Sequence, residues 1–472
     1  MAPRKLKTKA TGEIPLKFAK ILTSLVNRNW DKGSFLKNGS PVTQELLNHW
    51  FSDEICSTRE YNFHEGQRQA ILNTIYLHEV LGIKNVHDMY MKVQPELLSD
   101  MDLLNLKQDK YNHPKYAVKM ATGTGKTWVL NALILWQYLN AKYHNESSIF
   151  SKNFLIVAPG LIVYERLLDA FLGKERVDGT RDFDESDFKQ FEKLFVPSTY
   201  KDEIFGFIQN NVMKRDEISR KVTGEGLIAI TNWHRLKSEN NNLKIDDPFE
   251  DPTNMVKDVL PVSPGKTTGN DLNALDNQYL KGNEIEYLAE LPDLVVFNDE
   301  AHHIHDVKKG GEVFEVEWQK SLLKISESKK DKFIQIDFSA TPYIQTKGKQ
   351  KIKNYFPHII IDFDLKTAIW GGLVKTIVID KRKAMGAKEL DYNAEREGRR
   401  IIGLSESQKT MLSAGLTKLR ILEEQFISID ELKHPKMLVM CEETGVVPYT
   451  IQFLKSHGLD DEDIMEIHSN KK

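Results

Sequence analysis

Short apolar runs alternate with helical patterns along the first 370 residues of the chain. The runs lie at residues 116–120, 153–159, 226–231, 293–299 and 333–340. Each is almost continuously apolar, which is typical of strands buried on both faces of a parallel sheet. Helical periodicity separates them, for example at residues 128–138 and 161–171. This alternation predicts a doubly wound α/β sheet with helices on both faces.

Two polar stretches interrupt the alternation. Residues 174–222 are highly charged, and residues 237–290 are rich in Pro, Gly, Asn and Asp. Both predict insertions or long loops over the sheet edge.

A second, smaller unit is expected after the Gly371-Gly372 pair. It combines a long helix at about 405–428 with strands at residues 374–380, 436–441 and 463–468. The predicted organisation is an N-terminal extension, an α/β domain and a partial second α/β domain, at residues 1–60, 61–370 and 371–472.

The charge balance and the cysteine content exclude several classes of protein. The 472 residues contain 65 Lys and Arg against 68 Asp and Glu, a formal net charge of −3. This balance excludes binding of nucleic acid by bulk positive charge but permits a local basic channel. The two cysteines, Cys56 and Cys441, support neither a disulfide framework nor a Cys-rich zinc site, so we expect a reducing cytoplasm. No membrane partner is expected, because no signal sequence and no membrane-spanning run is found.

The strongest chemical signal is the sequence MATGTGKT at residues 120–127. It follows a predicted strand and opens a predicted helix, the context in which backbone N–H groups bind phosphate. The loop residues expected to bind a nucleotide are Thr122, Gly123, Thr124 and Gly125. Lys126 would reach the β- and γ-phosphates of ATP, and the Thr127 hydroxyl would bind Mg²⁺. Met120 replaces the first glycine of the usual phosphate-loop pattern.

Further polar residues follow two of the other apolar runs. Asp299 ends the run at 293–299 and Glu300 follows it, and both are the expected catalytic partners of Lys126. Asp299 would hold Mg²⁺, and Glu300 would orient and deprotonate the attacking water. Ser339 lies at the end of the run at 333–340 and Thr341 follows the run, and both could relay a hydrogen-bond change from the γ-phosphate to the next domain.

In these motifs the chain resembles superfamily 2 helicases and translocases. The phosphate loop resembles motif I, residues 299–302 (DEAH) motif II and residues 339–341 (SAT) motif III. Motifs Ia, Ib and IV are matched by residues 157–167, 229–236 and 437–443. The segment at 66–71 resembles the Gln-containing segment that precedes motif I. The resemblance implies that Gln67 reads adenine, that Phe63 stacks on it, and that His302 acts with Ser339 and Thr341 in coupling.

Within this superfamily, residues 46–469 most resemble the restriction (Res) subunit of type III restriction–modification systems and related defence helicases. The resemblance implies a P-loop NTPase with a RecA-like domain followed by a partial second one. It further implies a prokaryotic or phage-related translocase on double-stranded DNA, with a methyltransferase or specificity subunit as partner. Two alternatives stay open: a DEAH-type RNA helicase, and a nucleotide-dependent binding or scaffold module with little ATPase activity.

Three expected features of such motors are not found in the sequence. There is no motif V, no motif VI with its arginine fingers and no nuclease constellation. The Arg-rich stretch at 394–402 precedes motif IV, and Glu395 and Ile402 stand where motif VI has its glutamine and final arginine. We therefore expect the 472-residue chain to hydrolyse ATP slowly, and endonuclease activity would need a further domain.

Overall fold

The computed structural model describes most of the chain, in two compact units. The described residues are 13–101, 106–144, 149–221, 223, 225–232, 284–303, 307–309, 312–314, 317–329, 332–345, 353–376, 393–398 and 400–466. One unit extends to Thr376 and the other begins, among the described residues, at Asn393. Residues 13–60 belong to the first unit, where the sequence predicted a separate extension.

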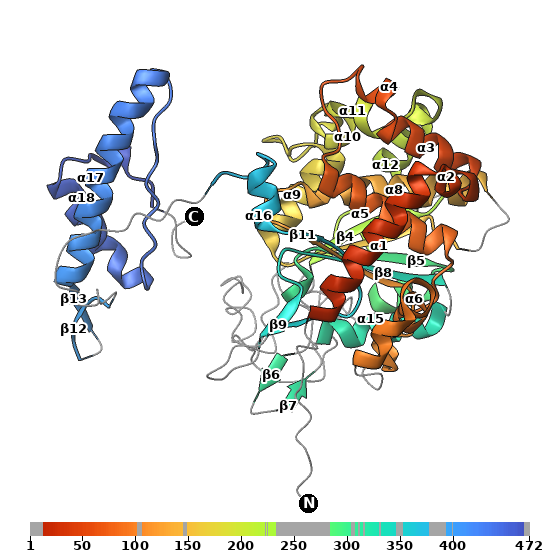
Figure 1. The fold of residues 1–472 in the computed structure, drawn as a ribbon. Coiled ribbons are helices and arrows are strands. Elements are labelled where there is room, and N and C mark those ends of the chain that lie inside the picture. Colours follow the sequence, from red (N-terminus) through yellow and green to blue (C-terminus); the bar gives the residue numbers. More distant parts are fainter. Residues whose placement is uncertain are drawn as a thin grey trace, which may run out of the picture. The chain divides into compact units, whose positions relative to one another are not determined.

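Seven parallel strands form the central sheet of the first unit (Figure 1). Their order is β11-β1-β8-β5-β2-β4-β3, and every neighbouring pair is parallel. The strands are β1 (Lys115–Met120), β2 (Asn153–Ala158), β3 (Val212–Met213), β4 (Leu227–Asn232), β5 (Leu294–Asn298), β8 (Phe333–Ser339) and β11 (Ile359–Phe363). All five strands predicted for the first unit are present, which confirms the α/β prediction.

Both faces of the sheet are covered. Along β2, Phe154 and Ile156 pack into one apolar cluster, whereas Leu155 and Val157 pack into another. Successive side chains of a strand point to opposite faces, so the two clusters mark the two sides. Helices α5 and α8 contribute to the first cluster, and α15 contributes to the second (Figure 1). The continuously apolar strands of the sequence follow from this double burial.

The helices of the first unit surround the sheet. The longer ones are α1 (Ile14–Asp31), α3 (Pro41–Phe51), α5 (Glu65–Ile75), α6 (Val86–Val93), α8 (Lys126–Tyr143), α9 (Leu161–Leu172), α12 (Lys201–Asn211) and α15 (Glu317–Lys329). The shorter ones are α2 (Ser34–Asn38), α4 (Asp53–Cys56), α10 (Asp187–Gln190), α11 (Glu192–Phe195) and α16 (Leu365–Trp370). Among the residues described, none of the helices has the length and apolarity needed to cross a bilayer.

The charged stretch at 174–222 is not the long loop that its composition suggested. It forms α10, α11 and α12 and then supplies β3, which pairs with β4 at the sheet edge. In α12, Ile204, Phe207 and Ile208 are buried at helical spacing, and this short apolar stripe was hidden by the surrounding charges. Residues 237–283, in the second predicted insertion, lie outside the described residues.

A buried polar cluster crosses the middle of the sheet. Asp337 on β8 is 1% exposed and accepts hydrogen bonds from the Asn298 and Gln335 amides, at 2.7 and 2.9 Å. His358 Nε2 lies 2.9 Å from its other carboxylate oxygen. Trp318 donates to the Asn298 side chain at 3.1 Å, so the cluster joins β5, β8 and α15. Asn298 directly precedes Asp299, so this cluster supports the strand end that carries the acidic motif.

The second unit is small. It contains a β-hairpin and two longer helices: β12 (Glu395–Glu397), β13 (Arg400–Gly403), α17 (Glu406–Ile429) and α18 (Val447–Ser456). The prediction of the long helix is confirmed, but that of a strand at 436–441 is wrong. Met437 and Val439 pack against the unit's core, whereas Leu438 and Met440 are 89% and 91% exposed. No strand among the described residues pairs with this segment, and an apolar run without a ladder partner cannot form a sheet. Residues 377–380 and 467–468, in the other two predicted strands, lie outside the described residues.

Replacing Asp337 by alanine is expected to destabilise the first unit by about 3–5 kcal/mol, because removing one member of a buried charged cluster leaves its partners unsatisfied. Urea unfolding followed by tryptophan fluorescence measures this loss, with Trp318 beside the cluster as a probe. The control is Asp31→Ala, at an exposed position, which should change stability by no more than about 0.5 kcal/mol. Equal stability of the two variants would contradict the structural role of the cluster.

Candidate nucleotide site

The predicted chemical groups converge at the carboxyl edge of the sheet. The phosphate loop follows β1, the acidic pair follows β5, and Ser339 ends β8. Since β8 lies between β1 and β5, the phosphate loop and the acidic pair are two strand spacings apart, about 10 Å. Open parallel sheets bind ligands at this edge, outside the strand ends. A long lysine side chain can bridge such a gap.

The phosphate loop needs its glycines for two reasons. Gly123 and Gly125 have φ values of +82° and +70°, in the left-handed region that residues with a Cβ rarely adopt. A Cβ on Gly125 would also lie 2.4 Å from the Gln67 Nε2 atom. Lys126 is the first residue of α8, so the loop ends at a helix N-terminus whose free N–H groups favour an anion.

The start of α5 holds this loop from behind. Gln67 donates from Nε2 to the Gly125 carbonyl at 3.1 Å and accepts from the His64 N–H at 3.1 Å. His64 Nε2 lies 2.9 Å from the Thr124 carbonyl oxygen. Both amide atoms of Gln67 are thus engaged within the protein, and adenine reading by Gln67 stays a prediction.

Phe63 has a core position instead of the exposed one that stacking on a base requires. It is buried, and its ring packs against those of Trp50, Phe51, Trp128 and Phe195. The sequence did not distinguish the two roles, because the rings that surround Phe63 come from distant segments.

Lys126 and Glu300 are brought together as a direct ion pair. The Lys126 Nζ atom lies 3.0 Å from Glu300 Oε1, and the two side chains are 11% and 25% exposed. Glu300 has a φ of +46°, one of two positive values at non-glycine residues in the described chain. Such a conformation is strained for a residue with a Cβ, and it occurs here at the turn that carries a predicted catalytic side chain.

Asp299, next to Glu300 in the chain, is held by two hydrogen bonds. Its N–H donates to the Val157 carbonyl at 2.9 Å, and its Oδ1 accepts from the Glu300 N–H at 3.0 Å. Burial raises the pKa of Asp299 above its ordinary value, and the positive charges of Lys126 and Arg166 oppose this shift. A cation beside a buried carboxylate stabilises its charged form, which burial alone would disfavour.

A magnesium-bound nucleotide fits these residues. The glycines allow the left-handed backbone of the loop, and Lys126 supplies a positive charge. Thr127 is partly exposed and carries a hydroxyl group, and Asp299 supplies a carboxylate whose charged form is disfavoured by burial. Thr122 is exposed on the same loop, whereas the Thr124 hydroxyl is turned inward and donates to the Ala121 carbonyl at 2.6 Å.

The three predicted coupling residues are also adjacent. The His302 Nδ1 and Ser339 Oγ atoms lie 2.9 Å apart, and Ser339 Oγ accepts from the Thr341 N–H at 3.0 Å. His302 Nδ1 is 3.5 Å from Glu300 Oε2. The acidic motif on β5 and the Ser–Ala–Thr motif on β8 are therefore linked by side chains.

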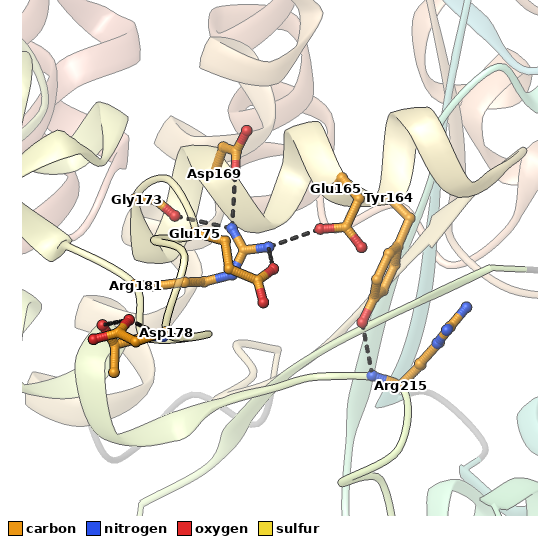
Figure 2. A network of polar contacts seen from close by, with 9 residues as sticks. Tyr164, Glu165, Asp169, Gly173, Glu175, Asp178, Arg181 and Arg215 are labelled. Atoms are coloured by element: carbon orange, nitrogen blue, oxygen red, sulfur yellow. Dashed lines mark hydrogen bonds and ion pairs between the residues drawn. The ribbon is translucent and has the colours of Figure 1, made fainter. Parts of the chain in front are cut away.

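A buried arginine fixes helix α9, which begins within the segment resembling motif Ia (Figure 2). The Arg181 side chain is 6% exposed and forms ion pairs with Glu165 and Asp169 on α9, both at 2.7 Å. It also bonds the Gly173 carbonyl at 2.9 Å and pairs with Glu175 at 3.2 Å. The same helix carries Arg166, whose charge acts on Asp299, so this clamp helps to set the site's electrostatics.

Sequence reasoning missed His64 and Arg181. A signal for His64 was present, since it stands three residues before Gln67, the spacing of a helix capping box. Arg181 gave no signal, because its partners are set by the fold of a loop. Residues 233–236, in the segment resembling motif Ib, lie outside the described residues.

Residues 60–344 match the family model described as type III restriction enzyme, res subunit. The match covers more than half of the chain and includes the phosphate loop, the acidic motif and the Ser–Ala–Thr motif. The chain belongs to this family. A comparison with curated proteins gave no significant match. The Res-subunit domain is a DEAD/DEAH helicase-family domain, so the site described above belongs to a helicase-like NTPase.

In this Res-subunit domain, Lys126→Ala is expected to weaken binding of Mg·ATP by about 10- to 150-fold, the loss expected for a hydrogen bond to a charged group. Isothermal calorimetry measures the affinity. The control is Lys142→Ala, which removes an ion-paired lysine near the other end of α8. Affinity unchanged by Lys126→Ala would refute the site assignment.

Glu300→Gln is expected to lower the rate of ATP hydrolysis by about 10²- to 10⁴-fold, because the amide cannot accept the water's proton. ATP affinity should be kept or increased, since Lys126 loses the carboxylate that competes with the phosphates. Single-turnover hydrolysis and calorimetry test the two effects separately, with Glu290→Gln at an exposed position as control. Normal hydrolysis in Glu300→Gln would exclude it as the general base.

Proposed function

We propose that this protein is an ATP-dependent translocase on double-stranded DNA within a type III-like restriction or phage-defence complex. The observation that carries the proposal is the contact between Lys126 and Glu300, at 3.0 Å, where the strand ends meet. A phosphate-binding lysine beside a candidate general base is the arrangement that nucleotide hydrolysis requires. Membership of the Res-subunit family supports DNA as the track.

The residues of this chain would divide the hydrolytic work. The loop N–H groups and Lys126 would bind the phosphates of ATP, and Glu300 would orient a water and accept its proton. The water oxygen would form the new bond to the γ-phosphorus while the bond to the bridging oxygen of ADP breaks. Thr127 and Asp299 would hold Mg²⁺. The bound metal ion supplies positive charge that stabilises the charge developing on the phosphates.

The ion pair would rearrange when a nucleotide binds. Without nucleotide, Lys126 Nζ lies 3.0 Å from the Glu300 carboxylate. Phosphates that attract Lys126 would free the Glu300 carboxylate at the moment when a base is needed. The contact between His302 and Ser339 would pass this change to β8.

Partners and location follow from the family and remain part of the proposal. A methyltransferase or specificity subunit would supply recognition of the DNA sequence, in a prokaryotic or phage-related cytoplasm. RNA is the alternative substrate, and a binding or scaffold role is the alternative without turnover.

A single-turnover ATPase assay with excess protein tests the proposal. We expect duplex DNA to accelerate hydrolysis by at least about tenfold, as a positioning effect on the reacting groups, and Glu300→Gln to abolish the acceleration. Displacement of a triplex-forming strand then measures movement along the duplex. Acceleration by RNA alone would favour the RNA helicase, and nucleotide-dependent DNA binding without acceleration would favour the binding module.

A further inference from the structure

We propose that His64 is a positioning residue for nucleotide binding, which acts by holding the phosphate loop through the Thr124 carbonyl. This inference rests on the proposed nucleotide site and adds to it a residue that no motif assigns. His64 lies immediately before α5, 60 residues away from Thr124 along the chain, and its ring reaches across to the loop.

The hydrogen bonds of His64 fix its tautomer. Nδ1 accepts from the backbone N–H groups of Gly66 and Gln67, at 3.0 and 3.4 Å, so it carries no proton. Nε2 is then the protonated nitrogen, and it donates to the Thr124 carbonyl oxygen at 2.9 Å. One neutral imidazole therefore caps α5 with one nitrogen and holds the phosphate loop with the other.

Because of the geometry of the peptide bond, this contact also orients the backbone N–H groups that would bind the phosphates. In a trans peptide the C=O and the following N–H point in opposite directions. Holding the Thr124 carbonyl toward α5 therefore turns the Gly125 N–H away from α5, toward the ligand side. Gln67 holds the Gly125 carbonyl in the same way and so turns the Lys126 N–H. Two successive backbone N–H groups of the loop are thus oriented by two side chains at the start of α5, those of His64 and Gln67.

The helix start is itself fixed relative to β1. The Phe363 carbonyl at the end of β11 accepts from the Ala121 N–H at 3.0 Å, directly before the loop. The Phe363 ring packs on the His64 ring, with centroids 5.2 Å apart. Gly66 lies against the same ring so closely that a Cβ there would come within 2.6 Å of it. His64 thus has little freedom to move away from Thr124.

The protonation state agrees with this role. Burial lowers the pKa of His64 below its ordinary value, while the Thr124 carbonyl and the Glu65 carboxylate oppose the shift. Burial thus favours the neutral ring that the two hydrogen-bond roles require.

The test separates the cap from the loop contact. Asparagine is among the best N-cap residues, so His64→Asn keeps the cap of α5, but its side chain is too short to reach Thr124. We expect His64→Asn to unfold at the wild-type temperature and to bind Mg·ATP about three- to tenfold more weakly, the loss of one hydrogen bond. In hydrogen–deuterium exchange without nucleotide, the amides of residues 121–127 should exchange faster.

A second cap provides the matched control. Asn85 caps α6 through the Asp88 N–H at 2.8 Å, so Asn85→Ala removes a cap elsewhere in the same unit. It should lower the unfolding temperature and leave the affinity for Mg·ATP unchanged. His64→Ala should show both effects, the lower unfolding temperature and the weaker binding.

Wild-type affinity and wild-type exchange in His64→Asn would overturn the proposal, as would equal losses of affinity in His64→Ala and Asn85→Ala. Lys126→Ala distinguishes this failure from a failure of the nucleotide site. If Lys126→Ala weakens binding and His64→Asn does not, the site stands and only the role of His64 is refuted.

Discussion

Parallel strands bring all their carboxyl ends to one edge of a sheet, and the candidate site of this protein depends on that constraint. The order β1-β8-β5 then places the phosphate loop and the acidic motif on either side of the β8 end. Lys126 and Glu300 meet because a long side chain spans the remaining gap. In an antiparallel arrangement of the same strand order, the end of β8 with Ser339 would lie at the opposite edge from the phosphate loop and the acidic motif.

Charge balance inside the site follows from that proximity. Burial disfavours the charged form of Asp299, and Lys126 opposes this effect while it pairs with Glu300. Arg166 on α9 adds a second positive charge that acts on Asp299. A divalent cation bound beside Asp299 would favour its charged form in the same direction.

Buried polar contacts, more than apolar packing, set the positions of the reacting groups. Asp337 ties the strand of the acidic motif to its neighbour, His64 holds the phosphate loop, and Arg181 fixes the helix that carries Arg166. Apolar packing tolerates small shifts of side chains, whereas hydrogen bonds between buried groups require particular distances and directions. This difference explains why such contacts occur where geometry matters for chemistry.

The sequence by itself determined five of the seven strands of the sheet, the glycine loop and the acidic pair. Each of these depends on neighbouring residues, through burial on both faces, left-handed turns and strand ends. Only the tertiary structure decided the roles that depend on distant partners. It buried Phe63 among other rings, turned the Gln67 amide and the His64 ring toward the phosphate loop, and added β3 from a charged stretch. It also left residues 436–441 out of any sheet among the described residues, because a strand is stable only with a partner, and apolar character along the chain does not supply one.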